Sequence, residues 1–261
     1  MQVLTRPWGA MHYCDQGPKD GPVLVFANSL GTDLRLWDAL LPHLPSGLRL
    51  LRYDKRGHGL SDTGGAAGIE DLADDAIALI EAAAPGPVVF VGLSIGGLIA
   101  QAVAARRPDL IRALVLSNTA ARIGTADTWQ ARIAAVNTDG LASIADAVME
   151  RWFAPGFRAT PDLALWRNML IRTPAPGYTA ACAAIAATDL TTATAALRLP
   201  ALVIAGEADG ATPPDLVQAT AALIPGAAFH ILPGAGHLPC VEAPAAYAAL
   251  LTRFLTEIAD A

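Results

Sequence analysis

Short runs of apolar, often β-branched residues alternate along most of the chain with segments in which apolar residues recur every three or four positions. The first pattern predicts strands that are buried on both faces, and the second predicts amphipathic helices. Val88 to Val91 form such a run, and the residues from Leu98 onward repeat at helical spacing. Strands that alternate with helices predict a mostly parallel sheet with right-handed crossovers and helices on both faces. We therefore expect an α/β fold.

The apolar runs predict eight strands. They are expected as two short strands within residues 2–15, which turn at 7–9, and then at 23–26, 48–53, 88–91, 111–117, 199–205 and 228–232. Helical spacing is seen at 34–41, 71–84, 98–107, 214–223 and 247–258. This order of elements is typical of one large domain with a doubly wound sheet.

The alternation stops after Asn118. Residues 122 to about 190 carry helical patterns without a convincing strand, and the strand pattern then returns at 199–205. We therefore divide the chain into a core of residues 1–121 and 190–261 and a helical cap of residues 122–189. The cap is expected to cover the mouth of the site, where it would exclude water and determine specificity.

Composition narrows the class of protein. Hydrophobic residues make up 53% of the chain and charged residues 16%, which argues against disorder, and the net charge of −6 argues against nucleic acid as a partner. No apolar run approaches the ~20 residues of a membrane-spanning helix, and no signal peptide is visible. Three cysteines without metal-type spacing favour free thiols in the cytoplasm. Nothing indicates a metal, a cofactor or an oligomeric state.

The pentapeptide Gly92-Leu93-Ser94-Ile95-Gly96 lies between a predicted strand and a predicted helix. A strand that turns into a helix within so few residues forces the central residue into a strained conformation, and glycine is needed two positions to either side. The turn projects the hydroxyl of Ser94 above the sheet. We therefore predict that Ser94 is a nucleophile.

A serine nucleophile needs a base, and the base needs an orienting acid. Because ligand sites of such folds lie beyond the carboxyl ends of the strands, the candidates must follow strands. His237 follows the last strand in a glycine-rich loop and is the predicted base, with His58 as a weaker candidate. Asp209 follows the strand before it and is the predicted acid, with Glu207 as the fallback. The order serine, acid, histidine is that of an α/β-hydrolase.

The tetrahedral intermediate of acyl transfer needs two preorganised backbone donors. One is expected from the N–H of Ile95, directly after the nucleophile. The other is expected from Leu30, in the Asn28-Ser29-Leu30-Gly31 loop that follows the strand at 23–26.

Several stretches together resemble the 3-oxoadipate enol-lactonases, a branch of the α/β-hydrolase superfamily that acts in aromatic catabolism (the β-ketoadipate pathway). They are FANSLGTDLRLWD (26–38), YDKRGHGLSD (53–62), GLSIGG (92–97), ERWFAPGFR (150–158), GEADGATPP (206–214) and GAGHLPCVE (234–242). The RGHG, GxSxG and GAGH motifs identify only the superfamily, whereas the Asn-Ser-Leu-Gly loop is narrower.

The resemblance implies an α/β-hydrolase fold, a small anionic lactone as substrate and no cofactor. It assigns the family's catalytic residues to Ser94, Asp209 and His237 and its oxyanion donors to Leu30 and Ile95. An acidic protein must hold an anionic substrate by a locally placed positive group, usually an arginine. Arg132 lies one helical turn after Trp129, so we predict that Trp129, Arg132 and Trp152 contribute to the substrate pocket.

Other functions share these features. A general carboxylesterase or another lactonase is the main alternative, and a cofactor-free haloperoxidase would use the same three residues. The fold also supplies hormone receptors and binding proteins without activity. Such a binding protein is expected to have lost part of the triad, and this chain has all three residues.

Overall fold

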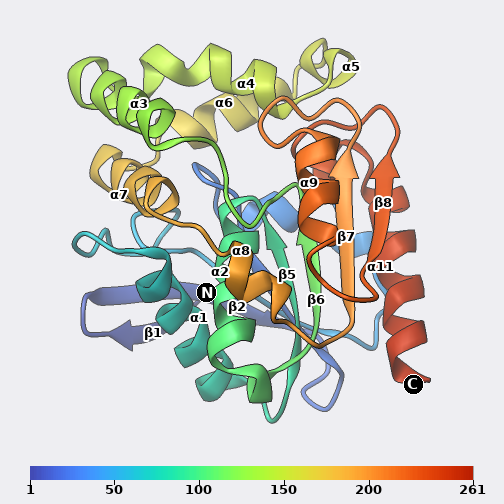
Figure 1. Ribbon diagram of the computed structural model, residues 1–261. Helices are drawn as coiled ribbons and strands as arrows, with labels where there is room; N and C mark the ends of the chain where they lie inside the picture. Colours follow the sequence, from blue (N-terminus) through green and yellow to red (C-terminus); the bar gives the residue numbers. More distant parts are fainter. Residues whose placement is uncertain (261) are drawn as a thin grey trace.

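The computed structural model describes residues 1–260 and contains an eight-stranded sheet, as the apolar runs predict (Figure 1). The strands lie side by side in the order β1-β2-β4-β3-β5-β6-β7-β8. Their bounds are Gln2–Arg6 (β1), Gly9–Gln16 (β2), Val23–Ala27 (β3), Arg49–Tyr53 (β4), Val88–Leu93 (β5), Ile111–Ser117 (β6), Ala201–Gly206 (β7) and Ala228–Leu232 (β8). The predicted α/β fold is confirmed.

Strands β3 to β8 are parallel, and the β1-β2 hairpin adds to β4 in antiparallel orientation. Every residue of β3, β4, β5 and β7 is buried, which explains why β3, β5 and β7 read as continuous apolar runs. Strand β4 also buries Arg49 and Arg52, which pair with Asp15 and Asp38. Because the parallel strands point the same way, the loops that follow β3 to β8 meet at one edge of the sheet. The candidate catalytic residues are all in these loops.

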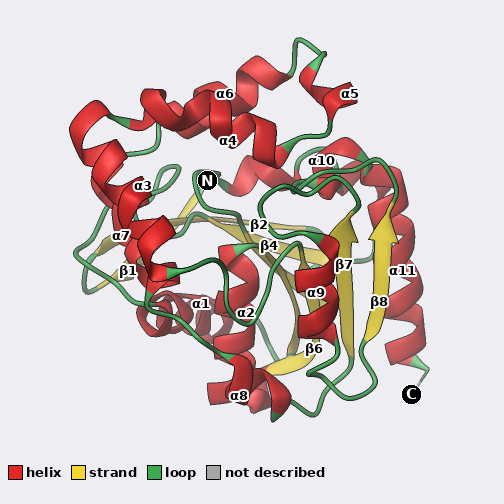
Figure 2. Cartoon of the chain, turned by 45° about the horizontal axis from the view of Figure 1, so that its top comes forward, coloured by secondary structure: helices red, strands yellow, loops and turns green. Residues whose placement is uncertain are grey.

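Helices cover both faces of the sheet (Figure 2). Helix α1 (Ile69–Ala83) packs on α2 (Ile95–Arg106), which lies on β3, β5 and β6, and α9 (Pro214–Ala221) lies on β7 and β8. On the opposite face α11 (Pro244–Ala259) brings Tyr247 edge-on to Trp37, whose ring lies 4.9 Å from that of Phe26 in β3. The short helix α10 (Pro239–Glu242) precedes α11.

The predicted helix at 34–41 is wrong in detail. The segment forms two short 3-10 helices, η1 (Leu34–Trp37) and η2 (Leu41–His43). Pro42 has no N–H, so an α-helix that began at 34 would lose a backbone hydrogen bond at this position. Another 3-10 turn, η3 (Pro108–Leu110), leads into β6.

The segment between β6 and β7 contains helices joined by loops and no strand, and most of it lies above the carboxyl ends of the strands (Figure 1). Its elements are α3 (Ala126–Asp139), η4 (Leu141–Ile144), α4 (Ala145–Trp152), α5 (Pro155–Arg158), α6 (Leu163–Ile171), α7 (Ala175–Ala186) and α8 (Thr191–Ala195). Helix α3 packs on α7 and α4 packs on α6, whereas α8 lies against α2 of the core. We call residues 122–189 the cap; its division from the core stays a prediction. None of the helices within residues 1–260 is both long enough and apolar enough to span a membrane.

Candidate active site

Ser94 occupies the turn between β5 and α2 with φ of 59° and ψ of −119°, a conformation that is strained for any residue but glycine. A Cβ atom at Gly92 would lie 2.2 Å from the carbonyl oxygen of Gly96, and one at Gly96 would lie 2.1 Å from that of Ala27. Both positions therefore require glycine, as the pentapeptide predicts. The turn leaves Ser94 with 7% of its surface exposed at the carboxyl edge of the sheet.

Asp209 and His237 are brought together from the loops after β7 and β8. The ring Nδ1 of His237 lies 2.9 Å from Oδ2 of Asp209, and both residues are buried. Asp209 Oδ1 also accepts hydrogen bonds from the backbone N–H groups of Ala211 (2.7 Å) and Thr212 (3.0 Å). The carboxylate is therefore fixed in one orientation behind the imidazole, which is the geometry of an acid that orients a base.

Burial favours the neutral form of Asp209, but the charge and hydrogen bond of His237 outweigh it. Further donors are the amide of Asn118 at 2.8 Å and the hydroxyl of Thr212 at 2.7 Å. Together they hold the pKa of Asp209 below its ordinary value. Asp209 therefore stays ionised at neutral pH and holds the Nδ1 side of the imidazole, so Nε2 lies on the side of the ring away from the acid.

The alternatives considered from the sequence have other partners. Glu207 accepts a hydrogen bond from the backbone N–H of Gly234 at 2.8 Å. The ring of His58 is buried beside the carbonyl oxygen of Arg56, and burial followed by the charge of Lys55 lowers its pKa well below the usual value. His58 is therefore neutral, and neither its Nδ1 contact nor the bond of Glu207 involves the Asp209–His237 pair.

Asn118 and Thr212 are functional candidates that sequence reasoning missed. Asn118 has φ of 47°, and its amide donates to Asp209 Oδ2 and, at 3.2 Å, to the carbonyl oxygen of Gly236. Asparagine tolerates this left-handed conformation better than most residues. The available signal was a polar residue directly after a buried strand, the same signal that singled out Asp209.

The predicted oxyanion donors come from the connection that carries Ser94 and from the loop after the neighbouring strand. Ile95 is the first residue of α2, and Leu30 lies in the loop after the neighbouring strand β3. Leu30 is 5% exposed, and its N–H meets no protein acceptor within residues 1–260. A buried N–H without an acceptor is costly unless a ligand supplies one, so it fits the role of an oxyanion donor.

The cap lies directly over the Leu30 loop. A Cβ atom at Gly31 would lie 2.6 Å from Leu170, 3.2 Å from Tyr178 and 3.5 Å from Trp152, residues of α6, α7 and α4. The buried Trp152 ring therefore lies close to the candidate oxyanion hole. Its contact with substrate stays a prediction.

Two arginines of the cap lie near the same region. The guanidinium of Arg132 lies 5.0 Å from the centre of the Trp129 ring, so these two side chains do share a side of α3. Burial raises the pKa of Tyr178 to about 12, and the charge of Arg132 opposes this rise. Burial and the charge of Arg132 both lower the pKa of Arg151. Neither arginine forms an ion pair within residues 1–260. Two neighbouring positive charges that no carboxylate pairs with directly favour an anionic ligand.

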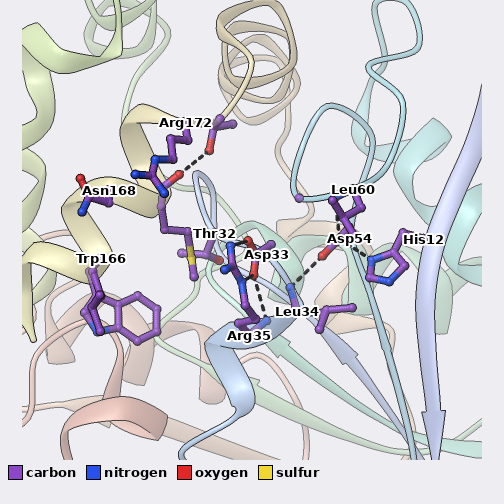
Figure 3. Close-up of a pocket in the computed structure, with 14 residues that line it drawn as sticks. His12, Thr32, Asp33, Leu34, Arg35, Asp54, Leu60, Trp166, Asn168 and Arg172 are labelled. Carbon is purple, nitrogen blue, oxygen red and sulfur yellow. Dashed lines mark hydrogen bonds and ion pairs between the residues drawn. The ribbon is translucent and has the colours of Figure 1, made fainter. Parts of the chain in front are cut away.

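A cavity of about 570 Å³ adjoins this region between α6 and the loops after β3 and β4 (Figure 3). Leu60 lies on one side of it and Trp166, Asn168 and Arg172 lie on the other. The wall includes Thr32, two residues beyond Leu30, but none of the predicted catalytic or substrate-binding residues. We therefore treat the cavity as a neighbour of the catalytic site.

Comparison with known proteins agrees with this geometry. The model of the alpha/beta hydrolase fold family matches residues 22–244. The chain therefore belongs to the α/β-hydrolase family, and it is a hydrolase.

Its relatives place it more narrowly. 3-oxoadipate enol-lactonase 2 of Acinetobacter baylyi is 36% identical over 248 residues, which cover 94% of this chain and 92% of the relative. Enol-lactonase 1 of the same organism is 33% identical over 260 residues, which cover 99% and 97%. The crystal structure of the enol-lactonase from Burkholderia xenovorans LB400 has a TM-score of 0.94 at 37% identity and covers 98% of this chain and all of that one. Within the α/β hydrolases the chain thus groups with the 3-oxoadipate enol-lactonases.

Proposed function

We propose that the protein hydrolyses 3-oxoadipate enol-lactone to 3-oxoadipate through an acyl-enzyme on Ser94. The observation that carries the chemistry is the 2.9 Å hydrogen bond between His237 and Asp209 at the edge of the sheet where Ser94 lies. The relatives that bear this activity by name, at 33% and 36% identity over nearly the whole chain, support the choice of substrate.

In the first half of the reaction His237 takes the proton of Ser94 while Oγ attacks the lactone carbonyl carbon. The N–H groups of Leu30 and Ile95 stabilise the tetrahedral oxyanion. When the intermediate collapses, the ring C–O bond breaks and His237 gives its proton to the departing oxygen, so the enol stays attached to the acyl-enzyme through the carbon chain. An enol is a better leaving group than an ordinary alkoxide, and it tautomerises to the ketone.

In the second half His237 activates a water molecule that attacks the acyl carbon. The bond to Ser94 Oγ breaks, the serine regains its proton from the imidazole, and 3-oxoadipate leaves with one molecule of water consumed overall. Asp209 orients the imidazole and stabilises its charged form in both halves.

The free carboxylate of the lactone is proposed to lie against the cap arginines. Arg132 and Arg151 are two cap arginines without an ion-pair partner among residues 1–260, and Trp129 and Trp152 are the proposed apolar walls. We place the enzyme in the cytoplasm, in aromatic catabolism (the β-ketoadipate pathway); its three free cysteines, two of them buried, suit a reducing compartment.

The test compares enol-lactone hydrolysis with that of a neutral nitrophenyl ester in the parent protein and in Ser94→Ala. We expect kcat/KM to favour the lactone and Ser94→Ala to lose about three to six orders of magnitude in kcat while remaining folded. Full activity in Ser94→Ala would refute the mechanism. A preference for the neutral ester would instead indicate a general carboxylesterase, and steady turnover excludes a receptor that is acylated only once.

A further inference from the structure

Lys55, two residues beyond the end of β4, is a buried positive charge to which the proposed reaction assigns no role. It is 2% exposed, and its ammonium donates to the carbonyl oxygens of Ser29 at 2.6 Å and Thr32 at 3.3 Å. These two carbonyl groups flank Leu30 and Gly31. A single side chain therefore fixes both ends of the loop that carries the proposed oxyanion donor.

The two carboxylates whose charges act on Lys55 are engaged elsewhere. Asp54 accepts from His12 at 2.7 Å, and Asp33 pairs with Arg35. No ion pair within the described 260 residues includes Lys55. Its charge is thus directed at backbone carbonyls, an unusual partner for a buried ammonium.

The carbonyl of Ser29 and the N–H of Leu30 belong to the same planar peptide unit. Besides Lys55, this oxygen accepts from the hydroxyl of Thr32 at 2.9 Å and from its N–H at 3.3 Å. Donors on an amide oxygen draw electron density from the nitrogen, so they strengthen the N–H on the other side of the same amide as a donor. A full positive charge does so more than a neutral donor does.

We infer that Lys55 is a positioning residue of the oxyanion hole. Its ammonium orients and polarises the Ser29–Leu30 amide. The Leu30 N–H therefore binds the tetrahedral oxyanion more strongly than it binds the substrate carbonyl. This inference rests on the proposed function. It predicts that Lys55 contributes to kcat and not to ground-state binding, because the oxyanion exists only in the intermediate and its transition states.

The energetics of the site support a functional role. Burial lowers the pKa of Lys55 to about 7, against the opposing charges of Asp54 and Asp33, and the neighbouring His58 is neutral. The charged ammonium therefore costs folding free energy at this position. A methionine of similar length at this position would avoid that cost. The carbonyl oxygen of Ser29 would still accept hydrogen bonds from the hydroxyl and the N–H of Thr32. A charge kept at a cost in stability is typical of a functional position.

The test is Lys55→Met, with Lys19→Met as the matched control, since Lys19 is the other lysine of the chain and its side chain is 66% exposed. We expect Lys55→Met to lower kcat about ten- to a hundredfold, somewhat less than removal of an oxyanion donor does. KM and the inhibition constant of 3-oxoadipate should stay within twofold. Inhibition by a trifluoromethyl ketone, which forms a tetrahedral adduct with the serine, should weaken by the same factor as kcat. The thermal midpoint should not fall, and Lys19→Met should match the parent.

Two results would overturn the inference: a kcat of Lys55→Met within twofold of the parent, or a joint fall of kcat, product affinity and thermal midpoint, which would indicate a purely structural role. The Ser94→Ala control separates this from the proposed function. If Ser94→Ala abolishes turnover and Lys55→Met does not lower it, only the role of Lys55 is refuted. If Ser94→Ala keeps the activity of the parent, the proposed reaction fails and the inference fails with it.

Discussion

The backbone N–H of His237 donates a 2.7 Å hydrogen bond to the carbonyl oxygen of Trp152, the last residue of cap helix α4. The N–H of Gly210, in the loop after β7, donates in the same way to Arg151 at 3.2 Å. The loops that hold the proposed base and its acid are thus bonded to one end of the cap. Any displacement of α4 should therefore change the position of the imidazole, so the cap and the catalytic loops act as one unit.

Glu242 strengthens this connection, and its removal should lower both stability and rate. Its carboxylate accepts from the N–H of Gly236 at 2.7 Å and from that of Ala154 at 2.9 Å, so it joins the His237 loop to the cap. Glu242→Ala leaves both donors without this acceptor. We expect the free energy of unfolding to fall by about 2 kcal/mol and kcat to fall about tenfold. Urea unfolding and lactone kinetics measure the two effects.

Glu242→Gln tests the charge separately. Burial raises the pKa of Glu242 above its ordinary value of 4.5, so in the window just above pH 4.5 the folded protein binds more protons than the unfolded chain. The free energy of unfolding of the parent should therefore decrease, relative to Glu242→Gln, as the pH rises through this window. A constant difference between the two proteins from pH 4.5 to 7 would contradict the assignment.

Asn118 should be needed for the orientation of Asp209. Asn118→Gly removes the amide donor but tolerates the φ of 47°, so it avoids the backbone strain that alanine would add. We expect kcat to fall about tenfold with KM little changed, because the carboxylate loses one of its fixed donors. Asn118→Asp should be worse, since a second carboxylate would repel Asp209 and raise its pKa. Equal kcat in Asn118→Gly and the parent would show that Thr212 and the backbone N–H groups suffice.

The sequence predicted those features of the fold and the site that depend on a local pattern of residues. Runs of strand-forming residues predicted all eight strands, and the glycines around Ser94 revealed a turn that no other residue permits. The sequence did not predict the hydrogen-bond partners that come from segments far apart in the chain. The hydrogen bond from Asn118 to Asp209 spans 91 positions, and the ammonium of Lys55 reaches a loop 26 residues earlier. Such partners are set by strand order, and a polar residue after a strand does not reveal which neighbour it will meet.

The close approach of Gly57 to Gly177 should make both positions intolerant of any side chain. Gly57 has φ of +67°, and a Cβ atom there would lie 2.3 Å from the Cα of Gly177, near the start of α7. Gly57→Ala should therefore lower the free energy of unfolding by about 2–4 kcal/mol, from backbone strain and from displacement of the cap. Gly226→Ala is the matched control, because φ there is +78° but an added Cβ atom would have no neighbour within 4 Å. Only backbone strain should therefore lower the stability of this variant. Equal losses in the two variants would show that the contact with α7 carries no energy.

The last prediction concerns the carboxylate of the substrate. The protein has a net charge of −6 and repels an anion at long range, so binding requires a nearby positive group that is free to pair with it. Arg132 stacks on Trp129 and has no ion-pair partner within residues 1–260. Removal of a charge-assisted contact should cost about 1.5–3 kcal/mol, roughly ten- to a hundredfold in kcat/KM for the lactone. A neutral nitrophenyl ester should be hydrolysed at nearly the parent rate.

The measurement is therefore a ratio: kcat/KM of Arg132→Ala on the lactone divided by that on the neutral ester, each normalised to the parent protein. Arg151→Ala should lower the ratio as well, because the two guanidinium groups are close enough for Arg132 to lower the pKa of Arg151. Arg122→Ala is the matched control, since this cap arginine is 60% exposed and faces Asp189 at 3.8 Å; it should leave the ratio at one. If Arg132→Ala lowers both activities equally, or neither, the carboxylate is held by another residue, because only a group that touches the charge distinguishes the two substrates.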